Sequence, residues 1–398
     1  MKYPKYAKII GYLSIVSFYI AGLYTGRREF FLIFFTLFFL VLFALILNLW
    51  TAFSFSFIQD ISLPIVVKGS MVYLKIGIYN DKPFPFTLMK IRTETVLPDK
   101  TYELRINLPP NSNIDYTIPV HCPYRGVYGV GMTKIEINDI FGLVKTRFDM
   151  RTLSYYKHRS IKILPKLIEL PYLPTRDTDA RHTNVSALHL SEDGDSYSDL
   201  RRYRPGDPLK KVHKPVSARH RELYVKTYDI PLENAVLVAI DAAMDIGVGE
   251  PARYLADIAC ECAVAIAAIS MQSGFNVEFV GADVIRVMRR GRNKEQLPAI
   301  CEALADIPFN GEGDLNYALE SVASNVEGLR AAYIISSSEP AVYADALLRL
   351  QRDGCFVCFL KVSHTKAKSE SESSLLGINI ITITPGDDIR LILTGEFQ

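Results

Sequence analysis

Two long apolar runs open the chain. The second run, FFLIFFTLFFLVLFALIL at Phe30–Leu47, has 18 residues, of which only Thr36 is not apolar. A helix of that length rises about 27 Å, close to the thickness of the hydrocarbon core of a bilayer. The first run, Ile9–Tyr24, is also uncharged, and only the sequence TGRRE separates the two runs. The pattern predicts a hairpin of two membrane-spanning helices, followed by Trp50 as an interfacial anchor.

The charges around the hairpin bear on its orientation. Because Lys2, Lys5 and Lys8 precede the first run, a secretory signal peptide is an alternative for it. We favour two retained spans, since no small-x-small cleavage site precedes Arg27 and a second span follows at once. Both chain ends then share one side of the cell membrane. The lysines favour the cytoplasm for that side, whereas Arg27 and Arg28 in the turn favour the opposite orientation.

The six cysteines are too sparse for a disulfide scaffold in a chain of 398 residues, which favours a reducing compartment. We therefore expect a multi-pass protein of the cell membrane whose soluble domains are cytoplasmic. Cys355 and Cys358 form a CxxC pair, but an extended strand points residues three apart to opposite faces. Buried thiols are the expectation there, and also at Cys260 and Cys262, rather than metal ligands.

Strict alternation of apolar and polar residues follows the hairpin, in the segments VYLKIGIYN, YELRINL, YTIPVHC and TKIEIND. This period predicts short antiparallel strands in a β-sandwich-like domain. Glycines cluster here at Gly126, Gly129, Gly131 and Gly142. A phosphate loop is not indicated, because the required lysine and hydroxyl residue do not follow and no helix pattern opens. We expect bends and tight strand contacts instead.

A charged segment comes next. The acidic stretch LSEDGDSYSDL precedes Arg201–Lys226, which holds nine lysines and arginines. Tyr203, Tyr224 and Tyr228 interleave with these basic residues, as in some nucleic-acid sites. The acidic neighbour and the formal net charge of +2 argue against a polyanion-binding arm, so no nucleic-acid partner is expected.

Catalytic residue types also occur in this segment. His213 with Asp207 or Asp199 could form a base and its orienting carboxylate, with Ser217 as nucleophile, so a hydrolase is the alternative function. No GxSxG sequence surrounds Ser217. Arginine–carboxylate pairs that hold a loop are the interpretation we favour, because such pairs are directional.

Strand and helix patterns alternate after the charged segment. The run AVLVAI at Ala235–Ile240 ends at Asp241, a long amphipathic helical pattern follows, and further strand patterns include AAYIIS and CFVCFLKV. The alternation predicts a doubly wound α/β domain with Asp241 at the rim where ligands bind. The segment INIITITP is expected to add a strand. The predicted domains are 1–51, 52–175, 176–230 and 231–398.

The charged segment resembles the signature of the domain of unknown function 58 family. The residues that carry the resemblance are Tyr203, Pro205, Gly206, Asp207, His213, Ser217, Ala218 and Arg219. The β-rich part is similar to that family at Arg125, Gly126, Tyr128, Gly131, Asp139, Phe141, Gly142 and Leu143. The resemblance implies the layout of that family, in which two membrane spans and a β domain precede a von Willebrand factor A-like domain.

Such von Willebrand factor A-like domains often bind a divalent cation through an aspartate, two hydroxyl residues, a threonine and a second aspartate. Here Asp241 and Asp245 flank alanines and a methionine, and Gly313 stands near the position of the threonine. Asp314 and Glu339 could complete an altered Mg²⁺ site, since Mg²⁺ takes oxygen ligands. We expect instead that the metal-ion-dependent adhesion site (MIDAS) is degenerate and that no cofactor is bound.

The resemblance also implies a function. We expect a non-enzymatic, membrane-anchored docking protein that works with a MoxR-type AAA+ ATPase in assembling or maturing envelope or membrane-associated complexes. The chain has no GxxxxGK[ST] sequence, so a partner would have to hydrolyse ATP. The expected docking residues are those of the signature: Arg201, Arg202, Tyr203, Pro205, Gly206, Asp207, His213, Ser217 and Arg219.

Overall fold

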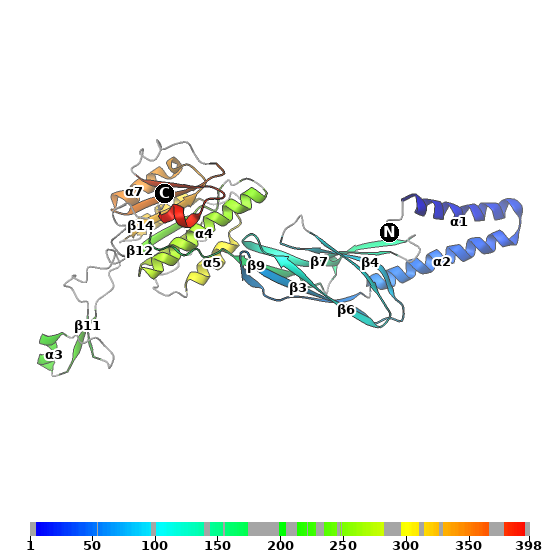
Figure 1. Ribbon diagram of the computed structural model, residues 1–398, viewed down its shortest axis with the longest axis horizontal. Coiled ribbons are helices and arrows are strands. Elements are labelled where there is room, and N and C mark those ends of the chain that lie inside the picture. The colour runs from blue at the N-terminus through cyan, green and yellow to red at the C-terminus, as the bar shows by residue number, and fades with distance from the viewer. Residues whose placement is uncertain are drawn as a thin grey trace. The chain divides into compact units, whose positions relative to one another are not determined.

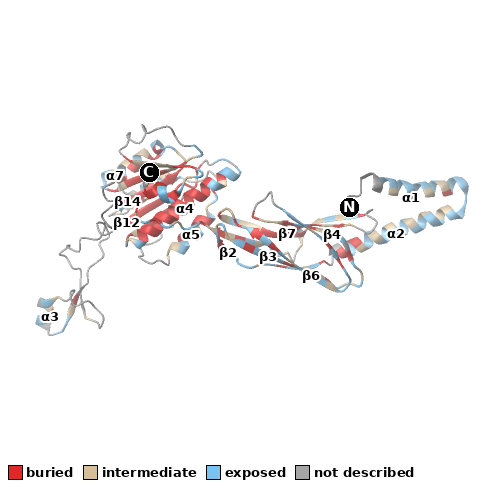
Figure 2. Cartoon of the chain, viewed as in Figure 1, coloured by how far each residue is buried: buried red, intermediate tan, exposed pale blue. Residues whose placement is uncertain are grey.

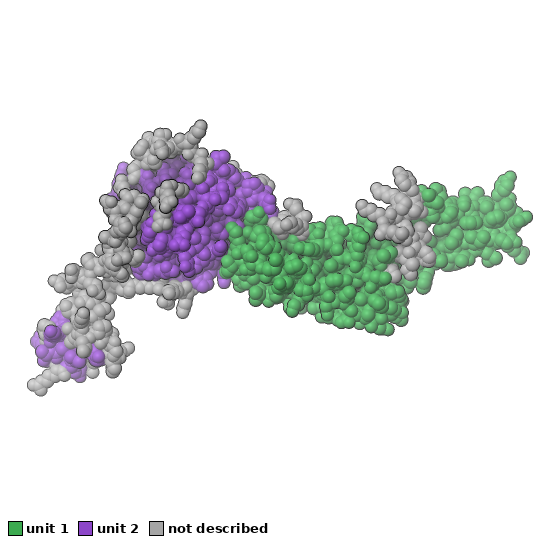
Figure 3. Space-filling view, viewed as in Figure 1, with its two compact units in different colours: residues 1–164 green, residues 165–398 purple. Residues whose placement is uncertain are grey.

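The structure is a computed structural model. It describes residues 5–53, 55–96, 101–138, 144–153, 156–173, 199–203, 213–220, 222–227, 235–244, 247, 249–281, 296–309, 314–325, 329–365 and 378–394. The chain divides into two compact units, unit 1 (Met1–Leu164) and unit 2 (Pro165–Gln398), which Figure 3 colours separately.

Unit 1 begins with a helical hairpin of α1 (Lys5–Thr25) and α2 (Arg28–Phe53). Gly26 closes α1: it has a φ of 67° and donates its N–H to the carbonyl of Gly22, so that only two residues separate the helices. Within Arg28–Thr51 of α2, the most apolar stretch of 18 residues has a mean hydropathy of 3.1, and none of it is buried within the protein. The pale and tan hairpin in Figure 2 shows this exposure. The predicted apolar hairpin is thus present, and α2 is long and apolar enough to cross a membrane.

The rest of unit 1 consists of two sheets. The strands are β1 (Ser56–Ile61), β2 (Ile65–Val67), β3 (Met71–Asn80), β4 (Phe86–Glu94), β5 (Tyr102–Leu108), β6 (Ser112–His121), β7 (Gly126–Asn138), β8 (Lys145–Asp149) and β9 (Arg159–Leu164), with a 3-10 turn η1 (Met150–Thr152) after β8. One sheet has the order β1-β3-β6, and the other has the order β2-β9-β7-β4-β5 with β8 paired to β7. The predicted alternating segments therefore form strands.

One core lies between these two sheets. Along β3 the side chains of Leu74, Ile76 and Ile78 are buried and the intervening positions are more exposed, as the alternating pattern predicts. They belong to the same apolar cluster as Ile91 of β4 and Ile135 of β7, which come from the other sheet. The packing of two inner faces explains why the period of two persists along these strands.

Two glycines of β7 permit close contacts between strands. A Cβ on Gly131, whose φ is 141°, would lie 2.7 Å from Oε1 of Gln59. That oxygen accepts the N–H of Met132, while Nε2 of Gln59 donates to the carbonyl of Lys157. A Cβ on Gly129 would lie 2.4 Å from the ring of His158. These contacts account for Gly129 and Gly131 as tight strand contacts, which the sequence predicted. Gly142 lies outside the described residues.

Unit 2 contains the remaining elements. They are β10 (Asp199–Arg202), α3 (Lys214–His220), β11 (Tyr224–Thr227), β12 (Ala235–Ile240), α4 (Glu250–Gln272), β13 (Asn276–Gly281), α5 (Gln296–Asp306), α6 (Leu315–Asn325), β14 (Leu329–Ser336), η5 (Pro340–Tyr343), α7 (Ala344–Arg352), β15 (Phe356–Val362), β16 (Asn379–Ile383) and α8 (Ile389–Thr394). Figure 1 shows several of these helices gathered around the sheet.

A five-stranded parallel sheet organises unit 2. Its strand order is β13-β12-β14-β15-β16, and all four pairings are parallel. Val238 and Ile240 pack in one core with α4, α5 and α8, whereas Leu237 and Ala239 pack in another with α6 and α7. Helices therefore cover both faces, as the alternating strand and helix patterns predict. The segment INIITITP does add a strand, β16, at the edge.

Helix α4 differs from the sequence expectation. Its pattern predicts an amphipathic helix, yet every side chain from Leu255 to Met271 is buried, including those of Asp257 and Glu261. Figure 2 shows α4 largely in the colour of buried residues. Although its length and composition would suit a membrane span, 94% of its most apolar window is buried within the protein. It is the core helix of the α/β part, and small residues such as Ala263 let it pack on several sides.

The CxxC pair takes the orientation expected of a strand. Cys355 belongs to the core on one face of the parallel sheet, and Cys358 belongs to the core on the other face. Both thiols are buried, as are those of Cys260 and Cys262. Burial raises the pKa of Cys355 and of Cys358 to about 12, so both stay protonated at neutral pH.

Candidate functional site

Asp241 follows β12 directly, at the point in the sheet where the strand order reverses. The strand β13 lies on one side of β12, and β14, a later strand of the sequence, lies on the other. Open parallel sheets bind ligands at this position, beyond the carboxyl ends of the strands. The backbone N–H of Asp241 donates to the carbonyl of Ile335 in β14 at 2.9 Å, which ties the two strand ends together.

Three buried side chains form a hydrogen-bonded network there. Oδ2 of Asp241 accepts hydrogen bonds of 2.7 Å from Oγ of Ser336 and from the hydroxyl of Tyr343. Oδ1 of Asp241 accepts the backbone N–H of Ala243 at 2.9 Å, and Oγ of Ser336 accepts that of Ser338 at 3.0 Å. Asp241 is 3% exposed, Ser336 0% and Tyr343 5%. We call Asp241, Ser336 and Tyr343 the rim network.

Burial keeps the hydroxyl of Tyr343 protonated. Desolvation, together with the hydrogen bond to Asp241, raises the pKa of Tyr343 to about 12, so its hydroxyl is a donor at any physiological pH. Hydrogen bonds to a carboxylate are shorter and stronger than those between neutral groups. The rim network therefore holds the carboxyl ends of β12 and β14 with charge-assisted bonds rather than leaving an open crevice.

A divalent cation does not fit the described part of this rim. Mg²⁺ requires several oxygen ligands with free lone pairs, usually carboxylates. Both oxygens of Asp241 already accept protein hydrogen bonds, and Tyr343 directs a hydroxyl proton toward one of them. Among the residues that the structure describes, no three His, Cys, Asp or Glu side chains gather as metal ligands would. Asp245 and Gly313, two of the positions considered for a cation, lie outside the described residues.

The other two candidate ligands have different partners. Asp314 caps α6, since its Oδ1 accepts the backbone N–H of Tyr317 at 3.2 Å. Glu339 forms an ion pair with Lys361 of β15. These contacts assign local structural roles to both carboxylates, and neither has a hydrogen bond to Asp241 among the described residues.

Exposed side chains lie on η5, which carries Tyr343, and on helix α6, which is hydrogen-bonded to it. Nδ2 of Asn316, in the first turn of α6, donates to the carbonyl of Val342 at 3.1 Å and so brings α6 beside η5. The neighbouring side chains are unusually exposed for their size, with Tyr317 at 66% and Val342 at 57%. Glu339 adds a carboxylate at the start of η5. We call Asn316, Tyr317, Glu339 and Val342 the rim surface.

The signature segment folds as a strand, a short helix and a second strand. β10 pairs antiparallel with β11, and Arg202 is opposite Tyr224. Two further backbone bonds of 2.8 Å continue this pairing: Tyr203 donates to the carbonyl of Leu223, and His213 donates to the carbonyl of Tyr224. The two signature residues Tyr203 and His213 therefore lie beside the same strand although ten positions separate them.

His213 and Ser217 hold this fold together. His213 is the N-cap of α3, and its Nδ1 accepts the backbone N–H of Val216 at 3.2 Å. Pro215 occupies the first turn, where its missing N–H costs no hydrogen bond. The buried hydroxyl of Ser217 accepts the N–H of Tyr224 at 2.8 Å and donates to the carbonyl of Tyr224 at 3.4 Å. Both hydrogen bonds of Ser217 within the described residues thus go to backbone.

The structure describes the remaining signature residues only in part. Arg219 lies on the exposed side of α3. Arg201 and Arg202 belong to β10, where only their backbone is described. Pro205, Gly206 and Asp207 lie outside the described residues, so the predicted arginine–carboxylate pairs and the pairing of Asp207 with His213 remain expectations.

Sequence reasoning missed the contribution of Tyr343. Ser336 was apparent as part of the sequence SSSEP after β14, but Tyr343 lies 102 positions from Asp241 and in no motif. The available signal was a tyrosine seven positions after Ser336, the last residue of a buried strand. Such a residue has no distinctive local pattern, and only the fold of η5 directs it inward.

Comparison with known proteins finds one family model that matches part of the chain. Residues 199–347 match the family model described as "Protein of unknown function DUF58". No curated protein matches the chain. Among solved structures, the beta-glucosidase from Listeria innocua is similar at 8% identity with a TM-score of 0.16, over 28% of this chain and 16% of that chain. A likeness that weak carries no argument about fold or activity.

The family match begins at the first residue of β10 and ends within α7. It therefore includes the whole signature fold, the rim network and the rim surface. The resemblance noted in the signature residues is confirmed over this range, because residues 199–347 match the model of the domain of unknown function 58 family.

Proposed function

We propose that this chain is a non-enzymatic, membrane-anchored docking protein. In this proposal α1 and α2 anchor the chain in the cell membrane, with the soluble parts on the cytoplasmic side. The α/β part acts as a von Willebrand factor A-like domain whose rim surface binds a MoxR-type AAA+ ATPase. The complex would assemble or mature envelope or membrane-associated complexes, and the ATPase would supply nucleotide hydrolysis.

The rim network is the observation that carries this proposal. At the position where an open parallel sheet usually binds a small ligand, Asp241 is enclosed by the hydroxyls of Ser336 and Tyr343. A buried carboxylate that accepts three hydrogen bonds stabilises a fixed backbone shape, and a fixed shape favours protein recognition because little ordering is needed on binding. The network therefore supports a docking role for this edge.

The rim surface supplies the chemistry that a protein partner recognises. Tyr317 and Val342 are exposed apolar side chains, and the bond from Asn316 to Val342 holds them on adjacent elements. Aromatic residues in a rigid setting dominate the energy of many interfaces, with charged residues at the margin. In this proposal Glu339 is the charged residue at the margin of the interface.

The signature has a structural part in this proposal. His213 caps α3, and Ser217 binds the backbone of Tyr224, so both are used to keep the strand–helix–strand fold. This arrangement favours support over nucleophilic catalysis, for which the Ser217 hydroxyl would need its proton directed to a base. A hydrolase that uses Asp207, His213 and Ser217 is the competing function.

Binding of a purified partner tests the proposal. The full chain, in detergent, is immobilised and a MoxR-type AAA+ ATPase from the same source is passed over it with ATP, with ADP and without nucleotide. We expect nucleotide-dependent binding that the double variant Tyr317→Ala/Val342→Asp weakens at least tenfold, the loss typical of a central interface residue.

A matched control lies on another element of unit 2. Leu391 of α8 is also an exposed apolar residue, at 43%, and Leu391→Ala should leave binding unchanged. Equal binding by the wild type and the Tyr317/Val342 variant would contradict the proposed surface. Hydrolysis of an ester or peptide substrate by the wild type and its loss in His213→Asn would favour the competing hydrolase.

A further inference from the structure

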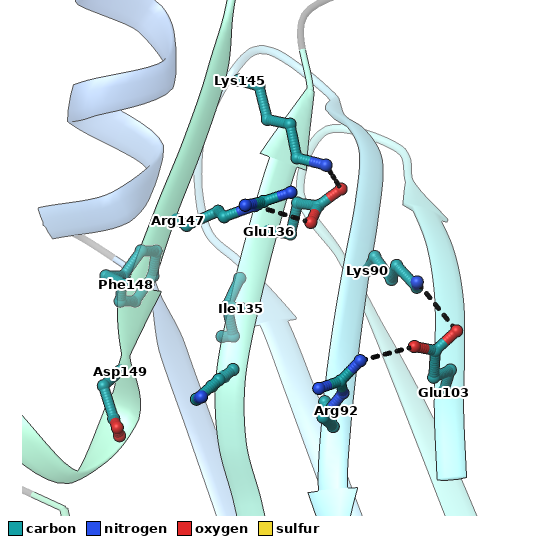
Figure 4. Close-up of a pocket in the computed structure, with 10 residues that line it drawn as sticks. Lys90, Arg92, Glu103, Ile135, Glu136, Lys145, Arg147, Phe148 and Asp149 are labelled. Carbon is teal, nitrogen blue, oxygen red and sulfur yellow. Dashed lines mark hydrogen bonds and ion pairs between the residues drawn. The ribbon is translucent and has the colours of Figure 1, made fainter. Parts of the chain in front are cut away.

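A charged groove lies on the outer face of the larger sheet of unit 1. Its volume is about 580 Å³, and its walls come from β4, β5, β7 and β8. Five basic and three acidic side chains line it, as Figure 4 shows in part: Lys90, Arg92, Lys134, Lys145, Arg147, Glu103, Glu136 and Asp149. The groove has an excess of two positive charges.

Each glutamate of the groove is shared by two cations. Glu103 pairs with Lys90 at 2.8 Å and with Arg92 at 3.1 Å. Glu136 pairs with Lys145, and with Arg147 at 3.0 Å. The dashed lines in Figure 4 trace these four contacts. Because one carboxylate cannot neutralise two cations, each of these groups keeps one net positive charge at the groove.

The acidic groups stay ionised at neutral pH. Partial burial of Glu136 acts to raise its pKa, but the hydrogen bonds and charges of Lys145 and Arg147 outweigh that effect and lower it below 4.5. The hydrogen bonds of Lys90 and Arg92 likewise lower the pKa of Glu103. The charge balance of the groove therefore does not change in the physiological range.

The groove continues to the helical hairpin. Lys145, at the start of β8, lines the groove and also a second cavity, where it and Val144 face apolar side chains of both helices. Those helix residues are Tyr12, Phe38, Val41, Leu42 and Leu45. Helix α2 also contacts β7 and β8. The α2 residues of this cavity run from the middle of the apolar run Phe30–Leu47 toward its Trp50 end, so the lysine stem lies on apolar surface and its ammonium reaches the lipid headgroups by extending toward that end.

A second contact places the same end of unit 1 beside the end of α2. The rings of Trp50 and Phe84 lie 5.0 Å apart, and Phe84 belongs to the connection between β3 and β4. Tryptophan at the end of an apolar helix favours the level of the headgroups. If α2 is a span, the two contacts bring the start of β8 and the connection between β3 and β4 close to the membrane surface at the Trp50 end of α2.

We propose that this groove binds the headgroups of anionic phospholipids from the bilayer that holds the hairpin. The inference rests on the membrane anchoring in the proposed function. Charge and position both favour this occupant. The groove has an excess of cations, which can contact phosphate oxygens in pairs. Lys145, which lines both the groove and the second cavity, lies beside the apolar helices. Binding there would fix the height and tilt of the β domain on the membrane.

Lipid binding by the full chain in detergent tests this proposal. Phosphatidylglycerol or phosphatidylcholine is added stepwise, and bound lipid is counted by native mass spectrometry, with glycerol phosphate as a free anion. We expect phosphatidylglycerol to bind more tightly than phosphatidylcholine. The variant Lys145→Gln/Arg147→Gln should weaken phosphatidylglycerol binding about tenfold, because each cation near anionic lipid adds to the electrostatic attraction between the protein and the headgroup.

Two further variants separate a headgroup site from simple structural ion pairs. Glu136→Gln removes a competing carboxylate and should strengthen phosphatidylglycerol binding, which a loss of fold would not do. Lys75→Gln/Lys157→Gln removes two exposed cations of unit 1 outside the groove and should leave binding unchanged. Circular dichroism verifies that each variant is folded.

The outcomes distinguish this inference from the proposed function. Equal phosphatidylglycerol binding by the wild type, the Lys145/Arg147 variant and Glu136→Gln would overturn the groove as a lipid site. Competition by glycerol phosphate or by a DNA duplex at similar concentration would overturn the lipid assignment in favour of a general anion site. Extraction of the chain from membranes by alkaline carbonate would instead contradict the membrane anchoring.

Discussion

The hydroxyl of Tyr343 donates a 2.7 Å hydrogen bond to Oδ2 of Asp241, although 102 positions separate the two residues in the sequence. This bond joins the end of β12 to the 3-10 turn after β14. With the second hydroxyl, that of Ser336, it encloses the carboxylate at the point where the strand order reverses. The stability of the proposed docking edge depends on this relationship.

Removal of the tyrosine hydroxyl should loosen the edge. Tyr343→Phe leaves Oδ2 of the buried Asp241 with one side-chain donor, and a hydrogen bond to a charged group contributes about 1.5–3 kcal/mol. Amide hydrogen exchange of β12 and β14 should become faster, by the factor that corresponds to this loss of free energy, because local opening of the strands costs less. Tyr317→Phe, at an exposed tyrosine, is the control, and equal exchange in both variants would contradict the role of the network.

The same bond predicts a loss of stability at alkaline pH. The folded state raises the pKa of Tyr343 from 10.0 to about 12, so it favours the protonated phenol. The stabilisation is complete below pH 10 and is lost as the pH rises from 10 toward 12. The melting temperature of the wild type, followed by circular dichroism, should therefore exceed that of Tyr343→Phe at pH 8, and this difference should shrink toward pH 12. A constant difference would count against the assignment.

Gly131 should tolerate no side chain. In Gly131→Ala the new Cβ would lie 2.7 Å from Oε1 of the buried Gln59, and the φ of 141° disfavours any L-residue. The free energy of unfolding should fall by more than 1 kcal/mol, roughly the sum of backbone strain and lost packing. Gly69 also has a positive φ, but a Cβ there would meet open space. Comparison of Gly69→Ala with Gly131→Ala therefore separates the backbone strain from the contact with Gln59. An equal loss in both variants would mean that the contact with Gln59 adds nothing.

The signature histidine and serine should behave as structural residues. His213→Ala removes the N-cap of α3 and should cost about 1 kcal/mol locally, whereas His213→Asn keeps an acceptor for the N–H of Val216. Ser217→Ala leaves the N–H of Tyr224 without its side-chain acceptor and should speed its exchange. Hydrogen exchange of α3 and β11 measures both effects. Wild-type protection of these amides in His213→Ala and Ser217→Ala would refute the structural assignment.

Hydrophobic patterning predicted most of the elements because burial imposes a period on each. The all-apolar run AVLVAI forms β12, and the alternating VYLKIGIYN forms β3 with Leu74, Ile76 and Ile78 inward. The apolar Phe30–Leu47 lies within α2. Even the late segment INIITITP was identified, since β16 needs only a short run of β-branched residues to pair with β15.

Patterning could not predict contacts between distant residues. Asp241 was recognised from its place after a strand, but the donors that enclose it depend on how η5 turns after β14. The structural role of Ser217 depends on the antiparallel return of β11, and the shared use of Glu136 by Lys145 and Arg147 depends on the register of β7 and β8. Register and loop direction follow from the whole fold rather than from local sequence.

Site-specific crosslinking tests the docking claim most directly. A photoreactive phenylalanine analogue is placed at Val342, or at Leu391 as control, in the full chain within its membrane, and the MoxR-type AAA+ ATPase is present with ATP. We predict a covalent product with the ATPase from position 342 and none from position 391. Products of equal yield from both positions, or none from position 342 under any nucleotide condition, would contradict a docking role for the rim surface.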